Sequence, residues 1–248
     1  MIKLRTRARA AALAALVPLA CFGGAAAAAQ FRISNVRLHL DAATPVDTIV
    51  LTSEDANDVT FEVHVMRWTQ GADGKWDQSP SQDLVVHPLI LKMPAKGEAR
   101  LRVGSISPTV AAEHAYRVEL QELPGPRAQT ANGQVRMLTK ISLPVFVEPP
   151  GAKANPTIEI KGSSLVLGNT GAAYLAPTDG MLTLRDAKGR TLHTLKMDTN
   201  YVLPGAHLPF KEQLPASACA HAASVELALP DAKPITAAVS PGSWRCAP

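Results

Sequence analysis

The residues best suited to metal chemistry are spread along the chain and form no ligand pattern. Seven histidines occur in 248 residues, without the i, i+2 or i, i+4 pairing that lets two imidazoles bind one metal ion. His39 and His64 lie in stretches that alternate apolar and polar residues, where a hydrogen-bonded structural histidine is commoner than a ligand. We therefore expect no metal and no cofactor.

The sequence also lacks the short motifs that mark common enzyme sites. It contains no Gly-x-Ser-x-Gly nucleophile turn, no His-Glu-x-x-His zinc motif and no glycine-rich phosphate loop. No nucleophilic side chain has a local acid–base partner that would activate it. These absences favour a binding protein over an enzyme.

Two cysteines near the end of the chain can pair with each other. Cys219 and Cys246 are the only cysteines after residue 29, and an even pair in an exported chain indicates a disulfide. Such a bond would stabilise the last stretch of the chain by about 2–4 kcal/mol, largely by restricting the unfolded state. Two free thiols are the alternative, which an oxidising compartment disfavours.

The first 29 residues have the three parts of a secretory signal peptide. Four bases occur in the first ten residues, an apolar run covers 11–22, and small residues lead to Ala29. The apolar run is shorter than the roughly 20 residues of a membrane-spanning helix. Cys21 leaves a lipoprotein as an alternative, although Pro18 stands where a lipobox favours leucine. We expect cleavage after Ala29, release into the periplasm and no membrane insertion afterwards.

The charge balance argues against a nucleic-acid partner. The chain has 25 basic and 21 acidic residues, but four of the bases lie in the leader at residues 1–29. The remaining 219 residues therefore carry 21 bases against 21 acids and are formally neutral. The basic pI comes from the leader, and no basic surface is expected on the mature chain.

Beyond the leader, apolar and polar residues alternate in short runs broken by proline, glycine, aspartate and asparagine. This period of two predicts strands of antiparallel β-sandwiches. An immunoglobulin-like sandwich takes about 100 residues, so the length predicts two of them. The clearest runs are 31–40, 60–68, 98–103, 116–122 and 135–143, followed by the shorter runs 157–161, 164–167, 181–185, 192–196 and 224–229.

A proline-rich stretch divides the chain into two parts. Residues 148–156 contain three prolines and one glycine, and proline makes such a linker stiff because it fixes φ. We therefore expect an all-β protein with an N-terminal domain at 30–149, a linker at 150–156 and a C-terminal β-sandwich at 157–248.

Several blocks of the first domain resemble a known family in their order and spacing. Together they resemble the periplasmic chaperones of the chaperone–usher pilus pathway (PapD-like proteins), and especially the branch called archaic. The resemblance implies two immunoglobulin-like sandwiches in a bent, two-lobed arrangement. The blocks are Asn35-Val-Arg-Leu-His-Leu-Asp41, Trp68-Thr-Gln70, the turn at 94–97 with the basic strand after it, 116–124, which ends in an acidic residue, leucine and proline, and the long run 135–147.

The resemblance implies that the run from residue 134 is a donor strand, lent to an incomplete pilin subunit. Val135, Met137, Thr139 and Ile141 lie on one phase of this run, and three of the four are apolar. We expect the start of this phase to enter the pilin groove and its end to enter the domain's own core. The alternative is an ordinary core strand that contacts no partner.

The resemblance also implies that Arg37 and Lys140 bind the C-terminal carboxylate of the pilin between the two domains. Ser142 competes with Lys140 as the position of the second anchor. Without the resemblance, a strand arginine and a strand lysine would indicate only a solvated face. Glu148 departs from the better-known branch, which has a base there, so the interdomain ion pair of that branch is not expected here.

The expected partners are pilin or fimbrial subunits and an outer-membrane usher. A secreted two-domain immunoglobulin-like adhesin or structural protein, which binds through loops without lending a strand, is the rival interpretation. A periplasmic small-ligand binder is a third, and the aromatic content of 4% disfavours it.

Overall fold

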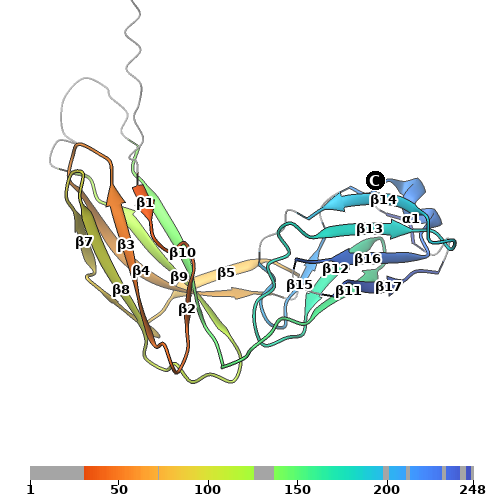
Figure 1. Ribbon diagram of the computed structural model, residues 1–248, viewed down its shortest axis with the longest axis horizontal. Coiled ribbons are helices and arrows are strands. Elements are labelled where there is room, and N and C mark those ends of the chain that lie inside the picture. The colour runs from red at the N-terminus through yellow and green to blue at the C-terminus, as the bar shows by residue number, and fades with distance from the viewer. Residues whose placement is uncertain are drawn as a thin grey trace, which may run out of the picture.

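The protein has two β-rich lobes that meet at an angle (Figure 1). This computed structural model describes residues 31–71, 73–125, 137–197, 201–210, 213–230, 233–240 and 244–246. The expected all-β fold, with two immunoglobulin-like sandwiches in a bent arrangement, is confirmed. The leader with its cleavage site and Val135 lie outside the described residues.

Two sheets form the first domain. One has the strand order β1-β3-β8-β6, and the other has the order β2-β10-β9-β4-β5, with β7 also paired to β4. Their strands are β1 (Phe31–Ile33), β2 (Leu38–Leu40), β3 (Val46–Ser53), β4 (Val59–Gln70), β5 (Trp76–Pro80), β6 (Leu84–His87), β7 (Ile90–Met93), β8 (Glu98–Ser105), β9 (His114–Glu122) and β10 (Lys140–Val147).

Alternating side chains of both sheets build the core of this domain. Phe61 of β4 and Leu120 of β9 are fully buried in the same cluster as Leu101 of β8 in the other sheet. Because successive side chains of a strand point to opposite faces, the intervening residues of β4, β9 and β10 point away from this core. The six-stranded sheet therefore has an outer face with side chains of its own.

The first alternating run forms two strands in different sheets. β1 pairs with β3, whereas β2 pairs in parallel with β10. Between them the chain crosses from one sheet to the other, and the Ser34 hydroxyl accepts the N–H of Val50 at 3.0 Å. The alternating run 31–40 therefore contains two strands, because alternation does not show where a chain changes sheets.

β10 begins later than the expected run 135–143. It pairs with β9 from Lys140, opposite Gln121, to Val147, opposite His114. The residues just before it, 137–139, have no regular secondary structure. The N–H of Thr139 donates to a carboxylate oxygen of Glu122 at 2.9 Å, which fastens the chain to β9 where β10 starts.

The second domain is a smaller sandwich with one short helix, α1 (Ala216–His221). Leu167, Leu184 and Leu227 come from its two sheets and are fully buried in one cluster. Within the described ranges, no helix is long and apolar enough to cross a membrane. Its sheets have the orders β11-β12-β15 and β14-β13-β16-β17, made of β11 (Pro156–Lys161), β12 (Ser164–Asn169), β13 (Met181–Arg185), β14 (Thr191–Lys196), β15 (His207–Pro209), β16 (Ser224–Ala228) and β17 (Ile235–Ala238).

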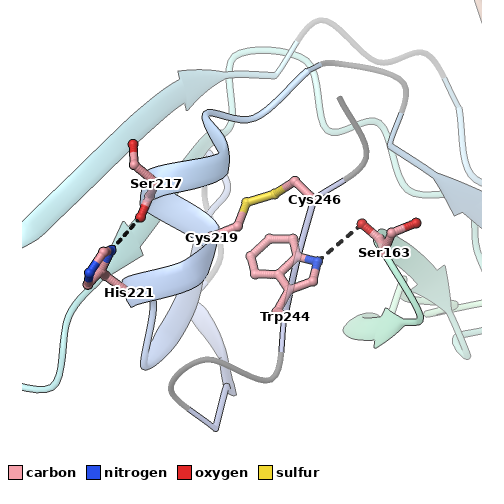
Figure 2. Close-up of a disulfide and its surroundings, with 6 residues drawn as sticks. All are labelled: Ser163, Ser217, Cys219, His221, Trp244 and Cys246. Atoms are coloured by element: carbon pink, nitrogen blue, oxygen red, sulfur yellow. Dashed lines mark hydrogen bonds between the residues drawn. A yellow bond between two sulfur atoms is a disulfide. The ribbon is translucent and has the colours of Figure 1, made fainter.

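The expected disulfide between Cys219 and Cys246 is confirmed. It joins α1 to the end of the described chain across 27 residues, with the two Cα atoms 5.9 Å apart (Figure 2). Trp244 lies beside the bond, and its indole N–H donates to the carbonyl oxygen of Ser163 at 3.2 Å (Figure 2). The disulfide and the buried indole together fasten the end of the chain to the second sandwich.

The β4–β5 hairpin extends from the first domain to the second (Figure 1). The side-chain oxygen of Gln70 accepts the N–H of Leu203 at 2.9 Å. At Gly74, where φ is +76°, an added Cβ would come within 2.8 Å of the Leu208 side chain. Only glycine suits both the left-handed backbone and this close approach to β15.

Candidate functional site

The candidate site lies where the outer face of the six-stranded sheet meets the second domain. Trp68 of β4, Ala115 of β9 and Phe146 of β10 belong to the same buried cluster as residues of the second domain. Alternation places Arg117 on the same face as Ala115, and Lys140 on the same face as Phe146. We call this region the interdomain junction.

Strand register places two arginines in one row across this face. Pro144 of β10 pairs with Arg117 of β9. The next residue, Val145, pairs with Leu38, so Arg37 comes beside Pro144 on its other side. Two strand spacings, about 10 Å, therefore separate the two arginine backbones.

Arg37 reaches from the first domain to two tyrosines of the second. Its Nε donates to the hydroxyl of Tyr201 and its Nη1 to the hydroxyl of Tyr174, both at 3.0 Å. The guanidinium carbon also lies 5.1 Å from the centre of the Tyr201 ring. Partial burial lowers the pKa of Arg37, but the two tyrosines outweigh it and raise that pKa above its ordinary value. Both hydrogen-bond acceptors are hydroxyl groups, so they orient the charge without neutralising it.

The two tyrosines that bind Arg37 are part of a cluster of packed aromatic rings. Phe146 stacks on Tyr174 with ring centres 4.1 Å apart, and Tyr174 meets Tyr201 edge-on at 5.2 Å. Trp68 meets the Tyr201 ring edge-on at 5.2 Å as well. Trp68 and Phe146 are almost fully buried. Rings from both domains thus form one apolar contact, which positions the two tyrosine hydroxyls.

Arg117 is the second cation of the row, and aromatic rings surround it. Its guanidinium carbon lies 4.1 Å from the centre of the Trp68 ring, 5.7 Å from that of Trp76 and 5.9 Å from that of Tyr201. The Nε of Arg117 is buried and has no hydrogen-bond partner among the described residues. Burial lowers the pKa of Arg117 below its usual value. Aromatic rings therefore surround this positive charge, and the neighbouring Tyr201 and Glu119 partly oppose the effect of burial on its pKa.

Lys140 lies on the same outer face but has a partner of its own. Its ammonium nitrogen is 2.8 Å from a carboxylate oxygen of Glu119, whose side chain is 12% exposed. The Lys140 side chain remains 55% exposed. Ser142, the competing position, is exposed and pairs opposite Glu119.

Two acidic groups, Glu148 and Glu113, also lie close to the interdomain junction. His39 is within 3.3 Å of Glu148, so in this chain Glu148 meets a histidine of its own domain. Glu113 is almost fully buried, and both its carboxylate oxygens accept the backbone N–H of Tyr174, at 3.1 and 3.0 Å. Burial, with a smaller contribution from Glu148, raises the pKa of Glu113 to about 8.

The expected donor residues differ from one another in their surroundings. Met137 is 64% exposed. Thr139 is half-buried and bonded to Glu122 through its backbone, and Ile141 packs partly buried against the first core. Val135 lies outside the described residues. The described part of the phase therefore runs from an exposed side chain towards the domain core.

β10 also has an edge that the described strands leave unpaired. β9 pairs with all of Lys140–Val147, but β2 pairs only with 145–147. On the β2 side, no described strand bonds to residues 140–143 of β10. An added strand there would end where β2 begins, beside Arg37.

The side chains of the junction suit an anion better than a metal ion. In the parts of the chain that the structure describes, no three His, Cys, Asp or Glu residues come close enough to hold a metal ion. A guanidinium group can bind a carboxylate through two parallel hydrogen bonds. With two guanidinium groups in one row, the junction is able to hold a carboxylate at the end of an open strand edge.

The first domain also matches a family model. Residues 30–153, half of the chain, match the N-terminal domain of PapD, described as a pili and flagellar-assembly chaperone. The chain belongs to this family. A search of curated protein sequences found no match.

Solved structures with a similar fold cover both domains. The class 5 fimbriae chaperone CfaA matches with a TM-score of 0.63 and 11% identity, over 86% of this chain and 100% of that one. SafB, in complex with the SafA pilin of Salmonella enterica, has a TM-score of 0.58 and 15% identity, over 85% and 96%. The CsuC–CsuE chaperone–tip adhesin pre-assembly complex from Acinetobacter baumannii matches with a TM-score of 0.54 and 18% identity. The match covers 74% of this chain and 90% of that one. At these identities, the likeness shows the shared fold.

Sequence reasoning missed several residues of the junction. Arg117 lies in a run that indicated only a strand and a block of the family pattern, and the two tyrosines lie in the weakly patterned second half. A signal was present for Arg117, because it is the one base on the outward phase of 115–121. Tyr174 and Tyr201 had no comparable signal, since loops of the second domain bring them to Arg37.

Proposed function

We propose that this chaperone holds pilin subunits in the periplasm by donor-strand complementation and delivers them to an outer-membrane usher. The observation that carries the proposal is the open edge of β10 at residues 140–143, which ends beside Arg37. An unpaired edge is a template for another strand, and chaperone–pilin complementation is a known use of such pairing.

The geometry gives the added strand a direction. A pilin whose C-terminal carboxylate binds Arg37 would run along β10 towards the junction, parallel to it. Its main-chain groups would bond to residues 140–143, which supplies affinity that tolerates changes in sequence. Val135, Met137, Thr139 and Ile141 remain the proposed donor residues, and the exposed Met137 is available to enter a groove of the subunit.

Arg37 and Lys140 remain the proposed anchors for the carboxylate. The hydrogen bonds of Arg37 to two tyrosine hydroxyls support its role as an anchor, because neutral hydroxyls leave its positive charge available to a carboxylate. For Lys140 the role requires release from Glu119, now at 2.8 Å.

We also propose that the chain belongs to the archaic-type branch. The sequence support is Trp68-Thr-Gln70, and the structural likeness to CsuC, from archaic chaperone–usher pili, is in keeping with it. Delivery to the usher, the leader at 1–29 and its cleavage after Ala29 stay predictions. The disulfide at 219–246 agrees with folding in an oxidising compartment.

The direct test is co-expression with the pilins encoded beside the chaperone gene. We expect a soluble 1:1 complex in periplasmic extracts, seen by size-exclusion chromatography. Arg37→Ala should lower its yield at least tenfold, because a carboxylate left without its partner in a partly desolvated site costs several kcal/mol. Lys140→Ala is expected to act in the same direction. If the folded wild-type chain captures no neighbouring pilin, the proposal of donor-strand complementation is wrong and the adhesin alternative is favoured.

A further inference from the structure

The two domains meet at Tyr174, which the first domain contacts through its backbone, its hydroxyl and its ring. Glu113 accepts the backbone N–H through both carboxylate oxygens, at 3.1 and 3.0 Å. Arg37 donates to the hydroxyl at 3.0 Å, and Phe146 stacks on the ring. The N–H of Glu113 also donates to the carbonyl oxygen of Ala172 at 3.0 Å. We call residues 172–174 the Tyr174 loop. A displacement of this loop would also remove a hydrogen bond from Arg37.

Glu113 is a buried acid without a basic partner. It is 6% exposed, and no basic side chain in the described parts of the chain forms an ion pair with it. The charge that acts on it is instead another carboxylate, that of Glu148. Burial raises the pKa of Glu113 to about 8, although the N–H of Tyr174 lowers it, and Glu148 adds to the rise. A carboxyl group in such surroundings is more stable with its proton than without it.

The groups that link Glu113 to Arg37 belong to both domains. Glu148, at the end of β10, lies 3.3 Å from His39 of β2. His39 lies 3.5 Å from the hydroxyl of Tyr174, which also accepts the hydrogen bond from Arg37. Burial raises the pKa of Tyr174 above its ordinary value, so its phenol keeps its proton while Glu113 titrates. The two acids and Arg37 are therefore connected through Tyr174.

Two further titratable groups are close to Glu113 but supply no counterion. His114 follows it in the chain, and burial, together with the charge of Arg67, lowers the pKa of His114. It is therefore neutral above pH 6.5, the ordinary value for histidine. Lys153 of the linker is exposed and contributes its backbone carbonyl oxygen, which accepts the N–H of Ala172 at 2.9 Å. A negative charge on Glu113 would thus stay uncompensated in the closed junction.

We propose that Glu113 holds the Tyr174 loop as a neutral carboxylic acid, and that loss of its proton to solvent releases this loop and weakens the capture of subunits. An ionised carboxylate buried beside Glu148 recovers its hydration only when the contact opens. The hydroxyl of Tyr174 would then leave Arg37, and the lobes would no longer hold one angle. The effect on capture rests on the proposed function, whereas the release of the loop does not.

The direction of the pH dependence follows from the two states of the junction. A glutamate exposed by opening titrates near 4.5, and Glu113 in the closed junction titrates near 8. The closed state therefore binds more protons between these values. Its advantage over the open state is complete below about pH 4.5 and is lost by about pH 8. The junction is closed in mild acid and loosens as the pH rises.

A purely structural role for Glu113 predicts the opposite direction. An ionised carboxylate is a stronger hydrogen-bond acceptor than a neutral one. If Glu113 held the N–H of Tyr174 as an anion, the contact would tighten with rising pH, and glutamine in its place would loosen it. Glutamine resembles the protonated acid in shape and has one acceptor and one donor group. Under the proposal, Glu113→Gln instead keeps the junction closed at every pH.

The experiment follows the full mature chain from pH 5 to pH 9 at constant ionic strength. Carbon-13 NMR of the glutamate carboxyl groups and nitrogen-15 NMR of the Tyr174 amide report the titration, and small-angle scattering reports the angle between the lobes. We expect the Glu113 midpoint to lie at least one pH unit above that of exposed Glu98. Wild-type scattering should broaden between pH 5.5 and pH 8.5, and that of Glu113→Gln should not. Glu98→Gln is the matched control and should behave like wild type.

Capture is measured on the complex with a pilin encoded beside the chaperone gene, purified after co-expression. Size-exclusion chromatography gives the fraction of the complex that remains after one hour at each pH. For wild type and Glu98→Gln, we expect at least a threefold lower fraction at pH 8.5 than at pH 5.5. For Glu113→Gln the fraction should change much less, because its junction has no proton to lose.

The outcomes separate this proposal from the proposed function. The proposal is overturned if Glu113 titrates together with Glu98, if the contact tightens as the pH rises, or if folded Glu113→Gln scatters with the pH dependence of wild type. Should Glu113→Gln not fold, the wild-type titration decides. Capture that falls equally with pH in wild type and in Glu113→Gln would overturn the effect on subunits. If the loop is released as expected but no pilin is captured at any pH, the switch is supported and the chaperone mechanism fails.

Discussion

Glu113 is an acid in an unusual place for one. It lies between the domains, almost fully buried, and accepts the backbone N–H of Tyr174 through both carboxylate oxygens. Its own N–H donates to the carbonyl oxygen of Ala172 at 3.0 Å. Burial disfavours the charged carboxylate and raises the pKa to about 8, although the bond from Tyr174 opposes this shift. The acid therefore couples protonation to the contact between the domains.

Replacing Glu113 with glutamine tests this coupling. Because the pKa is about 8 in the folded chain against an ordinary 4.5, the folded state binds more protons between these values, and stability falls as pH rises through the window. Glu113→Gln removes the ionisation and keeps an acceptor for Tyr174. We expect the unfolding free energy of the variant, relative to that of wild type, to rise by about 1–3 kcal/mol between pH 5 and pH 8. Urea denaturation at each pH measures this difference.

The control for this comparison is Glu98→Gln. Glu98 is more than half exposed and contacts Arg100 only at 3.8 Å, so its effect should be nearly constant over the same pH range. A Glu113→Gln curve parallel to that of wild type would show that the acid ionises in the folded protein as it does in the unfolded chain.

How much of the site was predictable differs from residue to residue. Arg37 could be placed because the family pattern fixes it beside a short apolar run. Lys140 was chosen for its residue type, whereas its ion pair with Glu119 depends on the register between β9 and β10. Tyr174 and Tyr201 reach the junction from the second domain, and no local pattern in one sequence shows which loops meet across a domain boundary.

At the level of strands, β10 has two different parts. Its end, at Leu143 and Val145, is buried in the first core, whereas Met137 and Leu138, which lead into it, are exposed. The alternation of the sequence predicted the strand and its core-facing phase. Among the described residues the strand begins only at Lys140, because the alternation continues through 137–139, which have no regular secondary structure. A segment with an unpaired edge has the same alternation of apolar and polar residues as a paired strand.

Met137 and Leu138 test whether the start of this segment is lent to a subunit. Both are exposed, at 64% and 46%, and they lie on opposite phases. Met137→Asp would put a charge into the apolar groove of the pilin, and we expect pilin capture to fall at least tenfold. Leu138→Asp, the matched control, should retain most of it, since its side chain would point away.

Thermal melts of both variants show whether folding is affected. Each should melt within about 2 °C of wild type, because exposed positions away from special contacts contribute little to stability. Equal losses of capture on both phases would rule out a strand that alternates into the groove. A Met137→Asp chain that no longer folds would show instead that the segment belongs to the chaperone's own core.

The disulfide between Cys219 and Cys246 stabilises the second domain. It closes 27 residues between α1 and the last described segment, so the loop-closure relation predicts a contribution of about 3.5 kcal/mol. We expect Cys219→Ala combined with Cys246→Ala to lower the unfolding free energy of the second domain by an amount of this order, measured by denaturant titration. Pilin capture through the first domain should survive below the new midpoint. Unchanged stability in the double variant would contradict the expectation.

For the molecule as a whole, the angle between the lobes depends on contacts that are spread along the chain. The β4–β5 hairpin bonds to Leu203, Arg37 reaches Tyr174 and Tyr201, and Glu113 holds the loop at Tyr174. The sequence predicted two domains and a proline-rich linker. It could not show that residues from β2, β4, β9 and β10 make one interface with the second domain, because each lies in a run that reads as an ordinary strand.

Two neighbouring residues of β10 separate the stability of the first domain from its coupling to the second. Phe146 and Val145 are both fully buried, but Val145 lies in the first core and Phe146 in the cluster shared between domains. Val145→Ala should therefore lower the melting temperature of the first domain, through a loss of about 1–3 kcal/mol. Phe146→Ala removes the ring that stacks on Tyr174 at 4.1 Å and should leave the first core intact.

We expect calorimetry of Phe146→Ala to show two separate transitions, with small-angle scattering broader than that of wild type because the lobes no longer hold one angle. Val145→Ala should keep the wild-type scattering profile at temperatures where it is folded. The two arginines lie beside Phe146 and share its aromatic neighbours, so capture of a subunit should weaken in Phe146→Ala even though the donor segment is unchanged. If both variants lower the same single transition and scatter alike, the two lobes fold as one unit, and the aromatic cluster is a core like any other.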